Sequence, residues 1–191
     1  FYADRNMFMG YGEFMPTEDV ALSVRKISRT ASRRIAEAAF KAAAGRRKHV
    51  TGVGKRHVLK ITDGLFIEEV EKVAAAHPDI GYREMDIDAM AADLYSHPDR
   101  YDVIVITNMF GDILSNAAVA MSGSLGLAAA LNASDDRAAA NAGHGSAPDI
   151  AGRGIANPTA LIGSVALLFE WLGQRGARDD LVAAGAGVRA A

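Results

Sequence analysis

Cysteine is absent from this chain of 191 residues. Its absence excludes a disulfide framework and a thiolate zinc site, and it fits a reducing compartment. Long hydrophobic runs are missing as well, since no stretch of about 18 apolar residues is available to span a membrane. We therefore expect a soluble protein of the cytoplasm, with no membrane partner.

An excess of charge of one sign is also missing. The 21 Lys and Arg residues and the 23 Asp and Glu residues give a net charge of −2 and are mixed along the chain. This balance excludes a basic footprint for nucleic acid. Half of the residues are hydrophobic, which is enough to build the core of one large domain or two small ones.

The periodicity of the apolar residues predicts strands that alternate with helices. We expect strands at residues 20–28, 49–53, 81–87 and 101–107, and helices at 30–44, 63–76, 88–96, 110–121 and 158–172. Strands separated by helices of this length indicate crossover connections and an α/β fold. The Ala- and Gly-rich residues 123–143 are predicted to be loop and linker, the helix at 158–172 to be the last one, and the tail after Gly173 to be frayed.

Polar side chains follow three of the expected strands. Lys55, Asp88 and Asp112 each come where a strand ends and the chain turns into a helix, the edge at which open α/β sheets bind ligands. Asn116 lies four residues after Asp112, on the same helix face. Carboxylate and carboxamide oxygens suit Mg²⁺ or Mn²⁺. The spacing alone leaves a second interpretation open, in which these are acids favoured at helix N-termini by the helix dipole.

Four segments resemble the β-decarboxylating dehydrogenases, the family of isopropylmalate, isocitrate, homoisocitrate and tartrate dehydrogenases. The sequence NMFGDILSN at 108–116 is similar to the metal-carrying helix of that family, and HGSAPDIAGRGIANP at 144–158 to its adenosine-binding loop. DIDAM at 86–90 resembles its V-D-A-M motif, and GKRHVLK at 54–60 its [HD]-K-A-N-[IV]-[LM]-K stretch.

The resemblance implies an isopropylmalate-dehydrogenase-like α/β fold without a Rossmann site, with mixed sheets and flanking helices. Residues 1–122 would form the smaller inserted domain with its dimer clasp and the metal and catalytic residues. Residues 123–191 would form the carboxy-terminal part of the dinucleotide-binding domain. Family members run to roughly twice this length, so the amino-terminal part of that domain is missing here, and we expect this piece to be inactive alone.

The resemblance also assigns roles to single residues. Asp88, Asp112 and Asn116 match the metal-binding positions. Lys55 matches the catalytic lysine, which takes the hydroxyl proton once its amine is neutral, and Tyr2 matches the tyrosine that returns a proton to the enol carbon. Other interpretations stay open, with Lys55 as a surface lysine in a turn and Tyr2 as a terminal aromatic residue packed on a neighbour.

The expected cofactor is NAD. No Gly-x-Gly-x-x-Gly follows a strand, and the loop at 144–158 resembles the NAD-using branch, in which the carboxylate of Asp149 faces the ribose hydroxyls and repels a 2′-phosphate. Ile155 would pack against the adenine. A plain turn cluster is the other interpretation. The cofactor-binding residues implied by the resemblance are His57, His144, Gly145, Ser146, Ala147, Asp149, Ile150 and Asn157.

Four positions depart from the family pattern. Arg56 replaces a small residue, His57 an asparagine near the nicotinamide, Asn116 a second aspartate at the metal, and Asn141 a glutamate. These changes are consistent with an unusual substrate or with weakened catalysis.

Two classes of function follow. The first is NAD- and metal-dependent oxidation, with decarboxylation, of a malate-like 2-hydroxy acid such as isopropylmalate, tartrate or isocitrate. The resemblance implies a homodimer with shared sites, in which the neighbour supplies the lysine and one aspartate. The second is a non-catalytic paralogue or fragment that dimerises or binds nucleotide without turnover.

Overall fold

The computed structural model describes residues 12–188 and divides the chain into two compact units, Phe1–Leu114 and Ser115–Ala191. The division falls inside helix α5 (Asn108–Met121). The domain boundary expected after residue 122 stays a prediction. Tyr2, the expected catalytic tyrosine, lies outside the described residues.

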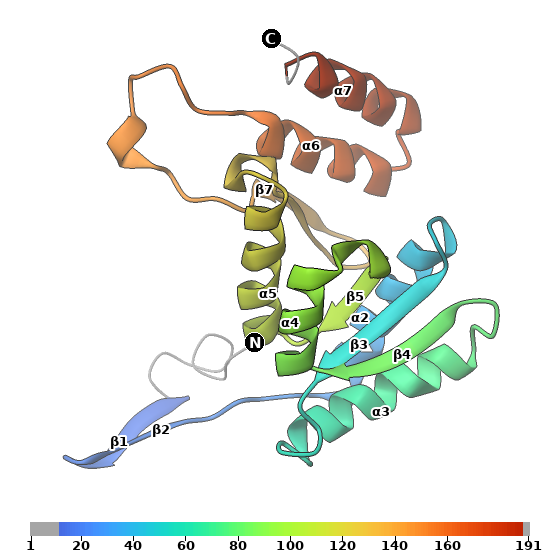
Figure 1. Cartoon of the computed structure of the whole chain (residues 1–191), viewed down its shortest axis with the longest axis vertical. Helices are drawn as coiled ribbons and strands as arrows, with labels where there is room; N and C mark the ends of the chain where they lie inside the picture. Colours follow the sequence, from blue (N-terminus) through green and yellow to red (C-terminus); the bar gives the residue numbers. More distant parts are fainter. Residues whose placement is uncertain (1–11, 189–191) are drawn as a thin grey trace. The chain divides into compact units, whose positions relative to one another are not determined.

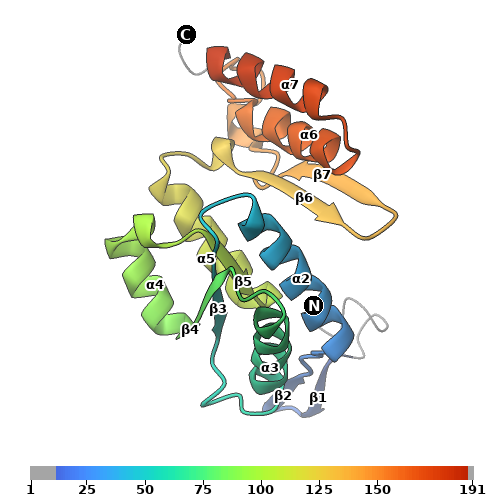
Figure 2. The ribbon, with the colours of Figure 1, turned by 90° about the vertical axis from the view of Figure 1, so that its right-hand side faces the viewer.

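The first unit is built on a three-stranded parallel sheet, in the order β4-β3-β5. Its strands are β3 (His49–Gly54), β4 (Gly81–Asp86) and β5 (Val103–Ile106). Helices α2 (Arg29–Ala44) and α3 (Thr62–Ala75) lie on one side of the sheet, and α4 (Ile87–Ser96) lies on the other (Figures 1 and 2). A short 3-10 helix (Pro98–Arg100) precedes β5. These elements match the strands and helices expected from residue 30 to residue 121, within a few residues at each end.

The core of this unit lies between the sheet and the α2 and α3 pair. Ala36, Phe40 and Ala43 recur at helical spacing along α2 and are fully buried. Phe66 and Ile67 of α3 pack in the same cluster, together with Val50 of the central strand β3 and Val105 of β5. The Ser28 hydroxyl accepts a hydrogen bond from the Ala31 N–H at 3.3 Å and caps the start of α2.

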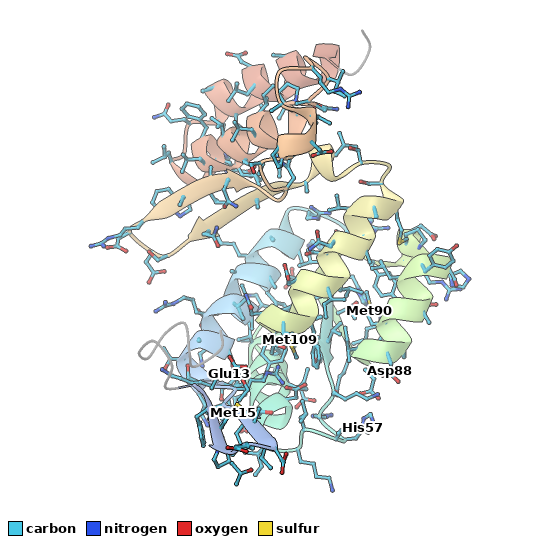
Figure 3. All side chains as sticks on the ribbon, turned by 90° about the vertical axis from the view of Figure 1, so that its left-hand side faces the viewer. Glu13, Met15, His57, Asp88, Met90 and Met109 are labelled. Atoms are coloured by element: carbon cyan, nitrogen blue, oxygen red, sulfur yellow. The ribbon has the colours of Figure 1, made fainter. Side chains whose placement is uncertain are left out.

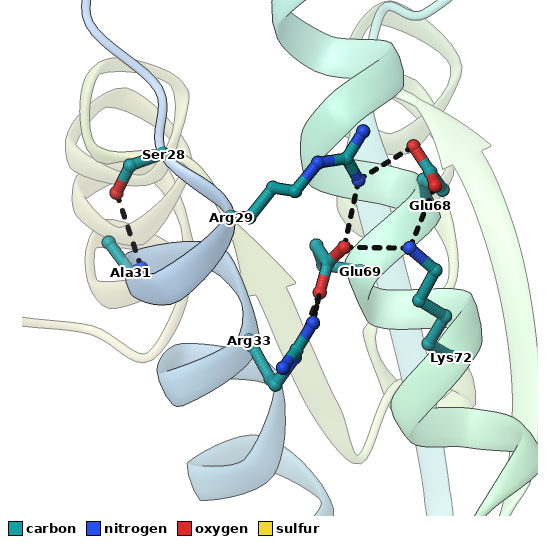
Figure 4. A network of polar contacts seen from close by, with 7 residues as sticks. All are labelled: Ser28, Arg29, Ala31, Arg33, Glu68, Glu69 and Lys72. Atoms are coloured by element: carbon teal, nitrogen blue, oxygen red, sulfur yellow. Dashed lines mark hydrogen bonds and ion pairs between the residues drawn. The ribbon is translucent and has the colours of Figure 1, made fainter.

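One buried carboxylate, Glu69 of α3, joins the two helices of that layer (Figure 4). It accepts hydrogen bonds from Arg33 at 2.7 and 2.9 Å, from Arg29 at 2.9 Å and from Lys72 at 2.8 Å. These hydrogen bonds, first of all that from Lys72, lower the pKa of Glu69 to about 2.

This network makes the free energy of unfolding depend on pH in the acid range. The pKa of Glu69 is depressed below its ordinary value of 4.5, so its contribution is complete above that value and is lost as the pH falls from 4.5 towards about 2. We expect Glu69→Gln to lower the melting temperature at neutral pH and to flatten the fall in melting temperature across this window. Thermal unfolding at several pH values measures both effects. Glu37→Gln, on the exposed face of α2, is the control, and parallel pH curves for all three proteins would contradict the expectation.

A two-stranded hairpin precedes α2. Strands β1 (Glu13–Thr17) and β2 (Val20–Ser23) pair antiparallel, and every residue of both is exposed. The hairpin stands apart from the helices and the sheet of its unit (Figure 1). Its exposed side chains include several large apolar ones: Phe14, Met15, Val20 and Leu22. An isolated hairpin is only marginally stable in water, and exposed apolar patches are typical of interaction surfaces. We therefore expect another protein surface to pack on this hairpin.

The second unit places an antiparallel hairpin against two helices. Strands β6 (Ala129–Ala133) and β7 (Ala138–Ala142) contact α6 (Thr159–Trp171), and α7 (Arg175–Val188) packs on α6. Short 3-10 helices occur at Leu125–Leu127 and Pro148–Ile150. Ser164 of α6 is fully buried, and its hydroxyl lies 3.0 Å from the Ala130 nitrogen and 2.9 Å from the Asn141 carbonyl.

Four expectations were wrong. Residues 123–143 are not a linker, because alanines without a β-branched pattern form a hairpin that α6 covers. The tail is not frayed over residues 175–188, and α6 is not the last helix, because these residues form α7, which packs on α6. The strand expected at 20–28 ends at Ser23, beyond which the Arg25 side chain bonds to Asp63. None of the helices in the described part of the chain is long and apolar enough to cross a membrane.

Candidate active site

The carboxyl edge of the parallel sheet gathers several of the expected site residues. Lys55 follows the last residue of β3, Asp86 ends β4, and Asp88 lies in the first turn of α4. β3 and β4 are parallel and in register, with Gly54 opposite Asp86, so the residues that follow the two strands meet at one edge. His57, in the loop after β3, and Asp88 lie at this edge (Figure 3).

The side chains at this edge form an ion-pair cluster. The Lys55 ammonium donates a hydrogen bond to Asp88 and lies 3.5 Å from Oδ2 of Asp86. The same Asp86 oxygen lies 3.0 Å from Nδ1 of His57. The structure thus brings together Lys55, Asp88 and His57 of the expected site, with Asp86 at their centre. Sequence reasoning missed Asp86 as a site residue, although it stands in the DIDAM segment near the end of the expected strand.

The charges in this cluster set the protonation of Lys55. The hydrogen bond to Asp88, with further attraction from Asp86, raises the pKa of Lys55 above its ordinary value. Reciprocally, Lys55 lowers the pKa of Asp88, and backbone N–H groups at the start of α4 add to that effect. A neutral Lys55 amine was expected for catalysis, whereas in the single chain two carboxylates face the Lys55 ammonium and favour its charged form. Asp88 also lies in the first turn of α4, where the helix dipole favours an acid, so the second interpretation given for it from the sequence stays open.

Arg56 makes its ion pairs outside this cluster. Its guanidinium binds Glu71 of α3 at 2.9 Å and Glu84 of β4 at 2.7 Å. Burial raises the pKa of Glu84, and the charge of Arg56 opposes that effect. Arg56 therefore ties the loop after β3 to α3 and β4 of the same unit.

Asp112 and Asn116 both lie on α5, one helical turn apart, so their side chains project from the same face. Residues 12–188 hold no group of three His, Asp or Glu side chains close enough together to bind a metal ion. The oxygen donors expected at a metal lie on two helices, Asp88 on α4 and Asp112 and Asn116 on α5.

The expected nucleotide loop connects β7 to α6 and is exposed through most of its length. Ala147 has a φ of 43°, and Gly152 and Gly154 have φ values of 76° and 66°, so the loop turns through backbone conformations that favour glycine. His144, Gly145, Ser146 and Asp149 are exposed, and Ile150 is half-buried. Oδ1 of Asn157 accepts a hydrogen bond from the Thr159 N–H at 2.9 Å, which anchors the loop to the start of α6.

The family model for isocitrate/isopropylmalate dehydrogenase matches residues 2–189. The chain is 48% identical over 165 residues to homoisocitrate dehydrogenase of Methanocaldococcus jannaschii, covering 86% of this chain and 47% of that protein. It is 43% identical over 165 residues to 3-isopropylmalate dehydrogenase of Sulfurisphaera tokodaii, covering 86% and 48% of the two chains. The chain belongs to the isocitrate/isopropylmalate dehydrogenase family.

A solved structure confirms the fold. Isocitrate dehydrogenase from Methylococcus capsulatus matches with a TM-score of 0.82 and 43% identity, over 87% of this chain and 51% of that one. The expected isopropylmalate-dehydrogenase-like α/β fold, with parallel and antiparallel sheets and flanking helices, is therefore confirmed. The chain spans about half the length of the curated relatives that it matches.

Proposed function

We propose that this chain contributes the catalytic and metal-binding residues of an NAD- and divalent-metal-dependent dehydrogenase. The reaction is oxidation of a malate-like 2-hydroxy acid to the 2-keto acid, with transfer of a hydride to NAD and loss of the β-carboxylate as CO₂. The observation that carries the proposal is the cluster at the sheet edge, where Lys55 contacts Asp88 of the DIDAM segment.

Asp112 and Asn116 of one subunit and Asp88 of a second are proposed to hold Mg²⁺ or Mn²⁺. The donor set fits such an ion, because all three side chains offer the oxygen ligands that hard cations prefer. The carboxylate of Asp88 is 71% exposed and open to a second ligand. When bound, the cation would polarise the hydroxyl and carboxylate oxygens of the substrate and stabilise the charge that develops on them.

A homodimer would complete this site. The donors lie on two separate helices, Asp88 on α4 and Asp112 and Asn116 on α5, and the Asp88 carboxylate is bound within its own chain by Lys55. The exposed apolar side chains of the β1–β2 hairpin, Phe14 among them at 48% exposure, supply a surface for the same second copy. Two such hairpins would cover each other as a dimer clasp in a symmetric pair.

Lys55 is proposed to take the proton of the substrate hydroxyl as the hydride leaves. It does so only as a neutral amine, and its pKa is raised above its ordinary value chiefly by the hydrogen bond to Asp88. Any ligand that draws the Asp88 carboxylate away removes the largest cause of that rise. His57, 3.0 Å from Asp86, would lie beside the nicotinamide. Tyr2 would return a proton to the enol carbon after CO₂ is lost.

The loop at 144–158 is proposed to bind the adenosine half of NAD. Asp149, exposed in the 3-10 helix Pro148–Ile150, would accept hydrogen bonds from the ribose hydroxyls, and Ile155, 59% exposed, would cover the adenine. We expect Asp149→Asn to raise the ratio of NADP to NAD use, measured as kcat/KM, by roughly tenfold, since one repulsive charge is removed. Asp179→Asn, on the exposed surface of α7, is the control. An unchanged ratio would remove Asp149 from the cofactor site.

NADH formation by the full-length protein tests the proposed function. A panel of 2-hydroxy diacids is assayed with Mn²⁺ and with chelator. Metal-dependent turnover of one acid, with release of CO₂, is the expected result and names the substrate. Absence of turnover with every acid, while NAD still binds, would favour the non-catalytic paralogue that Asn116 and His57 left open.

A further inference from the structure

Asp63, near the start of α3, has a fully buried side chain directly beside the Lys55 backbone. Its Oδ2 accepts a hydrogen bond from the Lys55 N–H at 2.8 Å, and its Oδ1 accepts one from Nη1 of Arg25 at 2.7 Å. A buried carboxylate with both oxygens bonded has one favourable position, and that position is defined by its partners.

Arg25 extends the connection to a third segment. Its Nη2 donates a hydrogen bond to Oγ1 of Thr107 at 2.6 Å, and Thr107 directly precedes α5. The guanidinium also lies over the Phe110 ring, 5.2 Å from the ring centroid. The Arg25 side chain is only 18% exposed, so solvent screens this chain of contacts weakly. One buried acid therefore joins the residue after β3 to the residue after β5.

We propose that Asp63 is a positioning residue for the proposed base. It fixes the backbone of Lys55 and, through Arg25, sets that backbone relative to the start of α5, the helix that carries Asp112. The proposal rests on the proposed function, because it matters for turnover only if Lys55 takes the substrate proton. A displacement of about 1 Å at a catalytic group is enough to slow a reaction roughly 100-fold.

The variant that tests the proposal is Asp63→Asn, which keeps the volume and removes the charge that Arg25 binds. Glu69→Gln is its matched control, since it also neutralises a fully buried carboxylate bound by arginine but has no contact with Lys55. Both variants are expected to lower the melting temperature of the full-length protein. Only Asp63→Asn is expected to lower kcat, by at least about tenfold at a temperature well below both melting points, with the KM for NAD unchanged.

Hydrogen exchange provides a readout that does not depend on turnover. The Lys55 amide is expected to exchange at least about tenfold faster in Asp63→Asn than in the parent or in Glu69→Gln, while the Val53 amide within β3 keeps its rate. Unchanged kcat and unchanged Lys55 exchange in a destabilised Asp63→Asn would overturn the proposal and leave Asp63 a stabilising residue only. If the parent itself shows no turnover, the proposed function fails, and the Lys55 exchange rate alone decides whether Asp63 anchors that backbone.

Discussion

Lys55→Ala is expected to lower kcat for the substrate acid by roughly 1,000-fold, which is the usual range for removal of a general base. The side chain is 21% exposed and faces two carboxylates, so the alanine variant also leaves Asp86 and Asp88 without their ammonium partner. Binding of NAD should be retained, because the proposed adenosine loop belongs to the second unit. Steady-state kinetics and NAD titration on the same preparation separate these two effects.

Lys60→Ala supplies the matched control, since Lys60 is exposed and lies in the same segment as Lys55. We expect it to retain the turnover of the parent. Exogenous amines offer a further check, because a small neutral amine in the space left by Lys55 should restore part of the rate. Full activity of Lys55→Ala would remove the lysine from the mechanism.

Asp112→Ala is expected to weaken Mn²⁺ binding by at least about 100-fold and to abolish turnover, because it removes the anionic ligand on α5 and leaves only the neutral carboxamide of Asn116 there. Titration calorimetry with Mn²⁺ on the full-length protein measures the affinity without relying on activity. Asp99→Ala, an exposed carboxylate in the 3-10 helix before β5, is the control and should bind Mn²⁺ as the parent does. Equal Mn²⁺ affinity in Asp112→Ala would place the metal elsewhere.

Most of the first unit could be predicted from the sequence because its elements obey simple periodicities. The apolar positions of α2 recur every three or four residues, and β3 is nearly continuous in buried residues. Each element can therefore be predicted from its own stretch of sequence. The second unit lacked such signals. β7 alternates half-buried and exposed residues, but these are mostly alanines, and β6 does not alternate at all, so the sequence shows no strand period and the hairpin depends on its contact with α6.

The residues of the candidate site also fall into those that the sequence predicts and those that it does not. Lys55 and Asp88 could be predicted from short motifs, and the structure brings them into contact. Asp86 and Asp63 could not, because their importance comes from partners that lie far away along the chain. Asp63 is joined to Arg25 across 38 residues, and Arg25 to Thr107 across 82. The positions of Asp88 and Asp112, each near the start of a helix that follows a strand, could be predicted from the sequence, whereas the proposed assembly of a metal site with a second copy could not be derived from spacing.

Subunit complementation tests the central claim, a metal-dependent dehydrogenase site shared between two copies of this chain, most directly. Lys55→Ala and Asp112→Ala subunits, each inactive alone, are co-expressed and assayed for NADH formation with Mn²⁺. In a symmetric dimer with random pairing, half of the dimers are mixed and each has one intact site, so about a quarter of the parent activity should return. No recovery, in preparations where mixed dimers are shown to form, would contradict a shared site.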